Sequence, residues 1–183
     1  MLKLLDRDVE LATLEEAWTK ASSGKPQLLV VWGRRRVGKT FLLSHFVQRK
    51  RAVFFGATQQ AEAVELSRLS EAVARDLGRR TADLTAGGFP SWESALRFFV
   101  AIAADEPLVV VLDEVPYLTR STRGFASVVQ AVWDHVPPRT RLLFVLTGSA
   151  FGVIESMLGA GGALRGRPTA TLRLDPVSLP AAR

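Results

Sequence analysis

Continuous apolar runs alternate along this chain with longer segments in which apolar residues recur every three or four positions. Four runs occupy residues 27–32, 52–57, 108–112 and 142–146, and a fifth segment, 169–174, alternates apolar and polar side chains. Unbroken apolar runs are typical of strands that are covered on both faces of a parallel sheet, and alternation with a period of two is also typical of a strand. The pattern therefore predicts five β-strands.

The intervals between the runs carry the spacing of helices. Asp6 is placed to cap the first of these helices, Ser91 to cap the fourth, and Gly78 to end the third. Residues 84–90 contain a glycine pair, and residues 116–124 begin at a proline and end at a glycine, so both segments predict loops. The expected helices span residues 7–20, 39–48, 61–77, 92–104, 125–135 and 151–158.

Strands that alternate with helices indicate the α/β class, with a doubly wound parallel sheet between two helical layers. In such a sheet ligands bind beyond the carboxyl ends of the strands, and the polar motifs of this chain follow three of those ends. A length of 183 residues suits one domain, which would bury about 70% of the surface that its unfolded chain exposes. We therefore expect a single domain over residues 1–183.

The composition is that of an ordinary globular protein, and it excludes several kinds of site. Hydrophobic residues make up 48% of the chain and charged residues 23%, a balance that supplies a core. Cysteine is absent, which excludes disulfides and thiol chemistry, and two histidines do not make a metal site. No apolar stretch reaches the roughly 20 residues that span a bilayer, and the first residues lack a signal-peptide pattern. We expect a cytoplasmic location and no membrane partner.

An excess of basic side chains admits a polyanionic partner. Lys and Arg number 24 against 18 Asp and Glu, which gives a net charge of +6. Arg34, Arg35 and Arg36 lie together in one short segment, whereas the basic residues of 49–51 and 79–80 lie at expected helix ends, where solvated positive charge is common. Direct binding of nucleic acid is therefore kept as an alternative hypothesis.

Residues 33–40 have the pattern of a phosphate-binding loop, because they read Gly-Arg-Arg-Arg-Val-Gly-Lys-Thr between an apolar strand and a helix. Gly33 and Gly38 permit positive φ, so that backbone N–H groups can surround a β-phosphate at the N-terminus of the helix. Lys39 would place its charge between the β- and γ-phosphates, and the Thr40 hydroxyl would bind Mg²⁺. The expected nucleotide-binding residues here are Gly33, Arg34, Arg35, Arg36, Val37, Gly38, Lys39, Thr40 and Phe41.

The third apolar strand delivers two carboxylates, Asp113 and Glu114, at its carboxyl end, which is the form of a Walker B element. Asp113 would hold Mg²⁺ through its water shell. Glu114 would orient or deprotonate the water that attacks the γ-phosphorus. The alternative is an ordinary charged loop after a strand.

The fourth strand is followed by two hydroxyls, Thr147 and Ser149, which are placed to hydrogen-bond the γ-phosphate or the attacking water. A capping role for Ser149 is the alternative. Arg165 and Arg167 follow a glycine-rich turn, where either supplies positive charge to the transition state or lies at the surface without a catalytic role. The expected catalytic residues are Lys39, Asp113, Glu114, Thr147, Ser149 and Arg165, and the expected metal ligands are Thr40 and Asp113.

These stretches together resemble the AAA+ ATPases, and within them the archaeal-type ATPase family of prokaryotes. The resemblance covers nearly the whole chain. It rests on Leu-Asp-Arg-Asp-Val-Glu-Leu at 5–11, the loop at 33–40, Leu-Asp-Glu-Val-Pro-Tyr-Leu at 112–118, Leu-Thr-Gly-Ser at 146–149, Leu-Arg-Gly-Arg at 164–167 and Leu-Asp-Pro-Val-Ser-Leu at 174–179.

The resemblance implies a P-loop NTPase core: a three-layer α/β/α sandwich whose five-stranded parallel sheet has the strand order 5-1-4-3-2, with ATP and Mg²⁺ bound at its edge. Residues 1–25 would form a helical segment near the adenine, with Arg7 among the nucleotide-binding residues, and residues 26–183 would form the α/β core. Ser149 or Thr147 would take the sensor position, and Arg165 would align with the arginine before the last strand. Further domains of the family would lie beyond this core and would carry a protein or DNA partner, and a homo-oligomer stays open.

We therefore expect Mg²⁺-dependent ATP hydrolysis that drives a conformational change in a partner or in an adjoining domain. The alternatives are a switch that binds ATP or ADP with negligible turnover, and a DNA-associated ATPase platform. A GTPase is disfavoured, because residues 146–149 stand where the guanine-reading Asn-Lys-x-Asp motif would lie. A small-molecule kinase is disfavoured, because adjacent carboxylates suit the activation of water.

Overall fold

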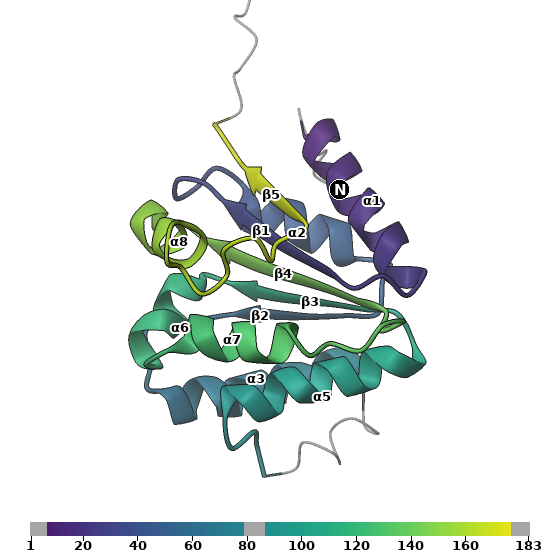
Figure 1. The fold of residues 1–183 in the computed structure, drawn as a ribbon, viewed down its shortest axis with the longest axis vertical. Helices are drawn as coiled ribbons and strands as arrows, with labels where there is room; N and C mark the ends of the chain where they lie inside the picture. The colour runs from purple at the N-terminus through teal and green to yellow at the C-terminus, as the bar shows by residue number, and fades with distance from the viewer. Residues whose placement is uncertain (1–6, 79–86, 177–183) are drawn as a thin grey trace, which may run out of the picture.

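The structure is a computed structural model that describes residues 7–78 and 87–176. Its strands form one parallel sheet in the order β2-β3-β4-β1-β5, which crosses the middle of Figure 1. From the opposite edge this order is 5-1-4-3-2, so the predicted strand order is confirmed. The strands are β1 (Gln27–Trp32), β2 (Ala52–Gly56), β3 (Leu108–Asp113), β4 (Leu142–Gly148) and β5 (Ala170–Arg173).

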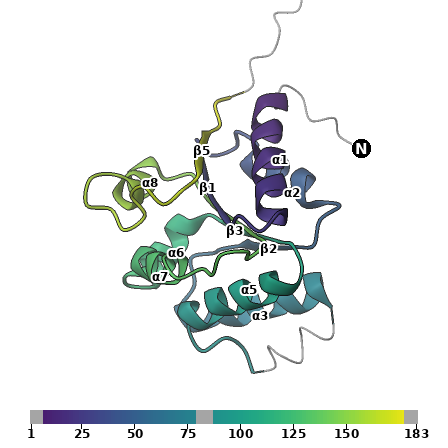
Figure 2. The ribbon, with the colours of Figure 1, turned by 45° about the vertical axis from the view of Figure 1, so that its right-hand side comes forward.

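Helices cover both faces of the sheet and complete the predicted α/β/α sandwich. Figure 2 shows α1 and α2 on one side of the sheet and the other helices on the opposite side, and the two hydrophobic clusters divide in the same way. The helices are α1 (Asp8–Ser22), α2 (Lys39–Val47), α3 (Glu62–Leu77), α5 (Trp92–Asp105), α6 (Val115–Ser121), α7 (Phe125–Trp133) and α8 (Phe151–Leu158).

The central strands supply both clusters because their successive side chains point to opposite faces. In β3, Val109 and Val111 pack toward α1 and α2, whereas Val110 and Leu112 pack toward α3, α5 and α7. Every residue of β3 and β4 is buried. Each fully buried side chain of this size contributes about 1.5–3 kcal/mol, which explains why these strands carry no polar alternation.

The loop predicted over residues 116–124 is wrong for residues 116–121, which lie in α6. Pro116 does not prevent this helix, because it occupies the first turn, where a backbone N–H has no intrahelical acceptor. The predicted cap at Ser91 is confirmed by a reciprocal pair of hydrogen bonds with Ser94, each 3.2 Å long. The proposed cap Asp6 and the first residues of the 84–90 loop lie outside the described residues. Within the described ranges, no helix has both the length and the apolar character needed to cross a membrane.

Gly148, the last residue of β4, lies where α6 and α8 approach the sheet. A Cβ at this position would lie 2.7 Å from Pro116 Cδ and 3.1 Å from Ile154 Cδ1. Because the proline ring is rigid, we expect Gly148→Ala to lower the free energy of unfolding by about 1–3 kcal/mol, as measured by urea denaturation. The matched control is Gly152→Ala in α8, whose Cβ would meet nothing within 4 Å. Equal stabilities of the two variants would contradict this close packing.

Candidate functional site

The phosphate-binding loop and the two polar strand ends meet at one edge of the sheet. β4 lies between β1 and β3, and Val31 of β1 pairs with Thr147 of β4. Since all of these strands are parallel, the segments that follow β1, β3 and β4 emerge side by side. The fold therefore brings together the three motifs that the sequence placed after strands.

The loop between β1 and α2 adopts its shape through two residues with positive φ and one tight approach. Arg36 has φ 66°, and Gly38, which precedes α2, has φ 94°. A Cβ on Gly33 would lie 2.3 Å from the carbonyl oxygen of Leu174, so only glycine fits between the loop and the segment after β5. The start of the loop therefore packs directly against the residue that follows β5.

Lys39 is the buried cation of the site, with a relative exposure of 5%. Its Nζ donates hydrogen bonds to the carbonyl oxygens of Gly33, at 3.0 Å, and Arg34, at 3.2 Å. A buried ammonium requires such acceptors, and these two carbonyls account for two of its three N–H groups. The backbone carbonyls of the loop therefore hold the ammonium group of Lys39 against the loop.

Asp113 joins all three strand ends through its two carboxylate oxygens. Oδ2 accepts a hydrogen bond of 2.6 Å from the hydroxyl of Thr40, and Oδ1 accepts one of 2.6 Å from the hydroxyl of Thr147 and one of 3.1 Å from the backbone N–H of Glu114. Thr147 is fully buried and Asp113 nearly so. These short hydrogen bonds to an ionised acceptor fix the carboxylate beside the loop.

The donor set at Thr40 and Asp113 fits Mg²⁺, because hydroxyl and carboxylate oxygens are the hard ligands that this ion takes. Among residues 7–78 and 87–176 no group of three or more acidic or histidine side chains could hold a metal by itself. An ion held by one carboxylate and one hydroxyl would complete its shell with water and substrate phosphate oxygens, which is the usual arrangement for Mg²⁺ at nucleotide sites.

Glu114 is held in an unusual backbone conformation immediately before α6. Its φ of 58° and ψ of 47° lie in the left-handed region, which non-glycine residues adopt mostly where function or tight packing requires it. Its Oε2 accepts hydrogen bonds from the backbone N–H of Ser149, at 3.2 Å, and from the Ser149 hydroxyl, at 2.9 Å. Ser149 therefore positions Glu114 and does not cap α8, whose N-cap is Ala150.

Lys39, Thr40 and Glu114 border a hollow of about 490 Å³ beside the loop. It is lined by Arg35, Arg36, Gly38, Lys39, Thr40, Phe41 and Glu114. The hollow is therefore bounded by three basic residues, Arg35, Arg36 and Lys39, by the N-terminus of α2 at Gly38, and by the carboxylate of Glu114. Its dominant positive charge suits a polyanionic ligand.

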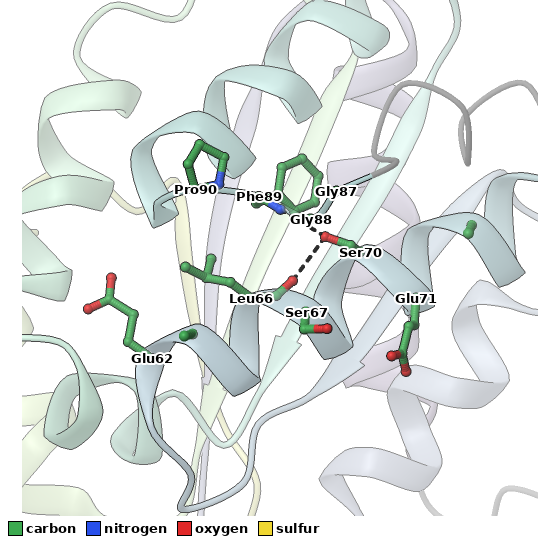
Figure 3. Close-up of a pocket in the computed structure, with 11 residues that line it drawn as sticks. Glu62, Leu66, Ser67, Ser70, Glu71, Gly87, Gly88, Phe89 and Pro90 are labelled. Carbon is green, nitrogen blue, oxygen red and sulfur yellow. Dashed lines mark hydrogen bonds between the residues drawn. The ribbon is translucent and has the colours of Figure 1, made fainter.

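A larger hollow, of about 890 Å³, lies between α3 and residues 87–90 (Figure 3). There the Ser70 hydroxyl accepts a hydrogen bond from the backbone N–H of Phe89 and donates one to the carbonyl oxygen of Leu66, both 3.0 Å long. These contacts join α3 to the segment before α5. The residues that line this hollow come from α3 and residues 87–90 and not from a strand end. We therefore take the smaller hollow, beside the loop and Glu114, as the candidate functional site.

The side chain of Arg7 contacts the backbone of the loop. Its Nη2 donates to the carbonyl oxygens of Val37, at 2.9 Å, and Asp175, at 2.6 Å, and its Nη1 pairs with Glu10 at 2.8 Å. Arg7 is buried, with a relative exposure of 7% for the whole residue. Sequence reasoning missed this bracing role, and the family resemblance alone drew attention to the residue.

Arg165 is not joined to these groups. It is exposed, and within the part of the chain that the structure describes no hydrogen bond or ion pair links its side chain to the loop or to Glu114. Arg167, by contrast, donates two hydrogen bonds of 2.7 Å to Asp134 after α7. These bonds lower the pKa of Asp134 below its ordinary value of 3.8, so the stabilising effect of the pair is present above that value and is lost as the pH falls through the lowered pKa.

Comparison with known families identifies the chain. Residues 4–182 match a family described as an ATPase domain predominantly from Archaea. The chain belongs to this family. It is thus an ATPase-family domain of the P-loop type, in agreement with the predicted resemblance.

Two relatives of the ATPase-family domain come from Methanocaldococcus jannaschii. One is an uncharacterised protein that is 25% identical over 174 residues, which cover 94% of this chain and 36% of the relative. The other is an uncharacterised ATP-binding protein that is 37% identical over 51 residues, which cover 28% of this chain and 81% of the relative. The chain therefore spans about a third of the length of the first relative.

Two solved structures share the fold of this ATPase-family domain. A Walker-type ATPase of Pyrococcus abyssi superposes with a TM-score of 0.66 at 19% identity, over 95% of this chain and 54% of that protein. Cdc6p from Pyrobaculum aerophilum superposes with a TM-score of 0.63 at 15% identity, over 96% of this chain and 47% of that protein. At these identities the superpositions establish the fold alone.

The Thr147 hydroxyl gives a direct test of the Asp113 network. We expect Thr147→Val to lower the free energy of unfolding by about 1–3 kcal/mol, because a buried carboxylate loses one of its donors, and also to slow any phosphate release. Urea denaturation and a phosphate assay measure the two effects. Thr147→Ser keeps the hydroxyl and is the control. If the valine and serine variants behave alike, the hydrogen bond to Asp113 has no role.

Proposed function

We propose that this domain binds ATP together with Mg²⁺ and hydrolyses it to ADP and phosphate, and that the hydrolysis drives a conformational change in an adjoining domain or partner. The observation that carries the proposal is the network in which Asp113 accepts hydrogen bonds from Thr40 and Thr147 beside the loop that holds Lys39. Membership of an ATPase family and the loop's position between β1 and α2 support the same reading.

The proposed binding mode follows from the loop. Backbone N–H groups at the start of α2 would face the β-phosphate, and the ammonium of Lys39 would exchange its loop carbonyls for phosphate oxygens. Thr40 and Asp113 would hold Mg²⁺, which when bound neutralises developing charge on the phosphates. Each of these groups is anchored by the backbone or by a buried partner before any ligand arrives, which reduces the cost of ordering on binding.

In the proposed hydrolysis, Glu114 would accept a proton from the attacking water. Its carboxylate borders the hollow, and Ser149 fixes it through two hydrogen bonds to Oε2. General-base assistance of this kind contributes about 10²–10⁴-fold to a rate. Thr147 would act as a positioning residue for Asp113, since its hydroxyl is already engaged there.

Transmission of the reaction would begin at Glu114, because α6 starts at the next residue and the first turn of α6 is hydrogen-bonded back to it. The Tyr117 backbone N–H donates to the Glu114 carbonyl at 2.9 Å. Movement of Glu114 between the ATP and ADP states would therefore displace the start of α6. No observation on the described residues singles out a DNA surface in place of a protein partner.

The test is a titration of the chain with ATP, with Mg²⁺ and with EDTA, followed by measurement of phosphate release on the same samples. Tight binding that needs Mg²⁺, together with phosphate release, supports the proposal. Binding without phosphate release would favour a nucleotide-dependent switch. Absence of binding would overturn the proposal.

A further inference from the structure

One contact links the phosphate-binding loop to α6 directly. Nη2 of Arg35 donates a hydrogen bond of 2.6 Å to the hydroxyl of Tyr117, across 82 residues of sequence. Arg35 is exposed, and Tyr117 is half-buried, with its ring packed against the hydrophobic cluster on the α6 side of the sheet. The ring is therefore anchored, and the guanidinium is the partner that is free to move.

The guanidinium of Arg35 occupies an electrostatically unbalanced position. Arg35 lines the same hollow as Lys39, Thr40 and Glu114. The carboxylate that lines the hollow, Glu114, is already engaged by Ser149, and that of Asp113 is engaged by two threonine hydroxyls. Among the residues that the structure describes, no acidic side chain forms an ion pair with Arg35.

A neutral phenol is a weak acceptor for such a cation. A guanidinium carries five N–H donors in a planar fork, and its hydrogen bonds to phosphate are charge-assisted and commonly bidentate. A phosphate group within reach would therefore compete successfully with the hydroxyl of Tyr117. The exchange needs rotation of one exposed arginine side chain and no change in the backbone.

The hollow also indicates which phosphate Arg35 would meet. The backbone around Gly38 and the start of α2 would surround the β-phosphate, whereas Glu114 must face the water that attacks the terminal phosphorus. Arg35 borders the space between the loop and Glu114, and Tyr117 lies one helical turn beyond Glu114. The side chain thus lies on the terminal-phosphate side of the loop.

We propose that Arg35 is a nucleotide-state sensor, which binds Tyr117 when the terminal phosphate is absent and exchanges Tyr117 for that phosphate when a nucleoside triphosphate is bound. The inference rests on the proposed function of the same site. Arg35 then discriminates ATP from ADP, and the release of Tyr117 reports the triphosphate state to α6.

The affinity test compares ADP with a non-hydrolysable ATP analogue, both with Mg²⁺, by calorimetry. Arg35→Ala is expected to reduce the preference for the triphosphate over ADP about tenfold, as loss of a charge-assisted hydrogen bond does. Tyr117→Phe removes the competing acceptor and is expected to raise affinity for the triphosphate about threefold, with ADP affinity unchanged. The control is Arg34→Ala, because Arg34 lines a different hollow with Trp32 and Phe151, and its effect on the two nucleotides is expected to be equal.

A second readout uses the fact that Tyr117 is the only tyrosine in the chain. Labelling with tyrosine carrying ¹³C at Cζ gives a single resonance that responds to hydrogen bonding of the hydroxyl. We expect the ATP analogue, but not ADP, to shift this resonance toward its position in Arg35→Ala. In Arg35→Ala the analogue is expected to produce no such shift.

Two results would overturn the sensor: an equal loss of ADP and analogue affinity in Arg35→Ala, or a Tyr117 resonance that the analogue leaves in place. Either result leaves the proposed function standing if the unaltered chain binds both nucleotides and Lys39→Ala binds them more weakly. If the unaltered chain binds neither nucleotide, both proposals fail.

Discussion

Replacing Lys39 with alanine is expected to weaken ATP binding by about 10- to 100-fold, the loss that corresponds to a charge-assisted hydrogen bond to phosphate. The effect is large because the ammonium is buried and already directed by the carbonyls of Gly33 and Arg34. Lys39 is the buried cation of the loop, whereas Arg34, Arg35 and Arg36 are exposed and, within the described part of the chain, are not held by loop carbonyls in the same way. Calorimetric titration with ATP and Mg²⁺ measures the loss.

Lys50→Ala is the matched control for Lys39→Ala. Lys50 lies beyond the opposite end of α2, and its Nζ is also held by a carbonyl, that of Phe46 at 2.9 Å, and by Glu15 at 2.8 Å. Removing it deletes the same charge from the chain without touching the loop, so ATP affinity is expected to be unchanged. A similar loss in both variants would mean that overall charge, and not the loop, determines binding.

The second large effect is expected for Glu114→Gln, which should retain ATP binding and reduce phosphate release by about 10²–10⁴-fold. Glutamine keeps an oxygen that can accept the hydrogen bonds from Ser149, so the geometry before α6 is preserved while the base is lost. Single-turnover phosphate release and ATP affinity, measured on the same preparation, separate the two functions.

Glu155→Gln, on the exposed surface of α8, removes an equal charge and serves as its control. Its phosphate release is expected to match that of the unaltered chain. An equal fall in ATP affinity and phosphate release in Glu114→Gln would assign Glu114 to binding. No fall at all would leave the hydrolysis without its proposed base and would favour the switch.

Much of this fold could be predicted from sequence because its strongest signals are local. The unbroken apolar runs of β3 and β4 follow from burial on both faces, and the predicted range of β1, Gln27–Trp32, is confirmed. The α6 helix was missed because Pro116 is its second residue, and because Glu114, which precedes it in the left-handed conformation, makes no side-chain capping hydrogen bond. Seven residues carry too little periodicity to outweigh those signals.

The side-chain partners at the site required the folded structure. Residue type alone does not determine that the hydroxyl of Thr147 serves Asp113 while that of Ser149 serves Glu114, since both lie at the carboxyl end of the same strand. The contact between Arg35 and Tyr117 joins residues with no shared local pattern. The roles proposed for Lys39, Glu114 and Arg165 in catalysis remain predictions, and Arg165 is the one whose side chain the structure leaves apart from the others.

The guanidinium of Arg7 connects three parts of the fold: the phosphate-binding loop, the segment after β5 and the start of α1. One rigid planar group holds the carbonyl of Val37 in the loop and the carbonyl of Asp175 after β5, while its own backbone starts α1. A hydrogen bond tolerates displacements of only a few tenths of an ångström before it weakens. If the loop tightens around a ligand, the strain is therefore delivered to residues 7 and 175 together. A segment connected to residue 7 or to residue 175 would therefore be displaced together with the loop.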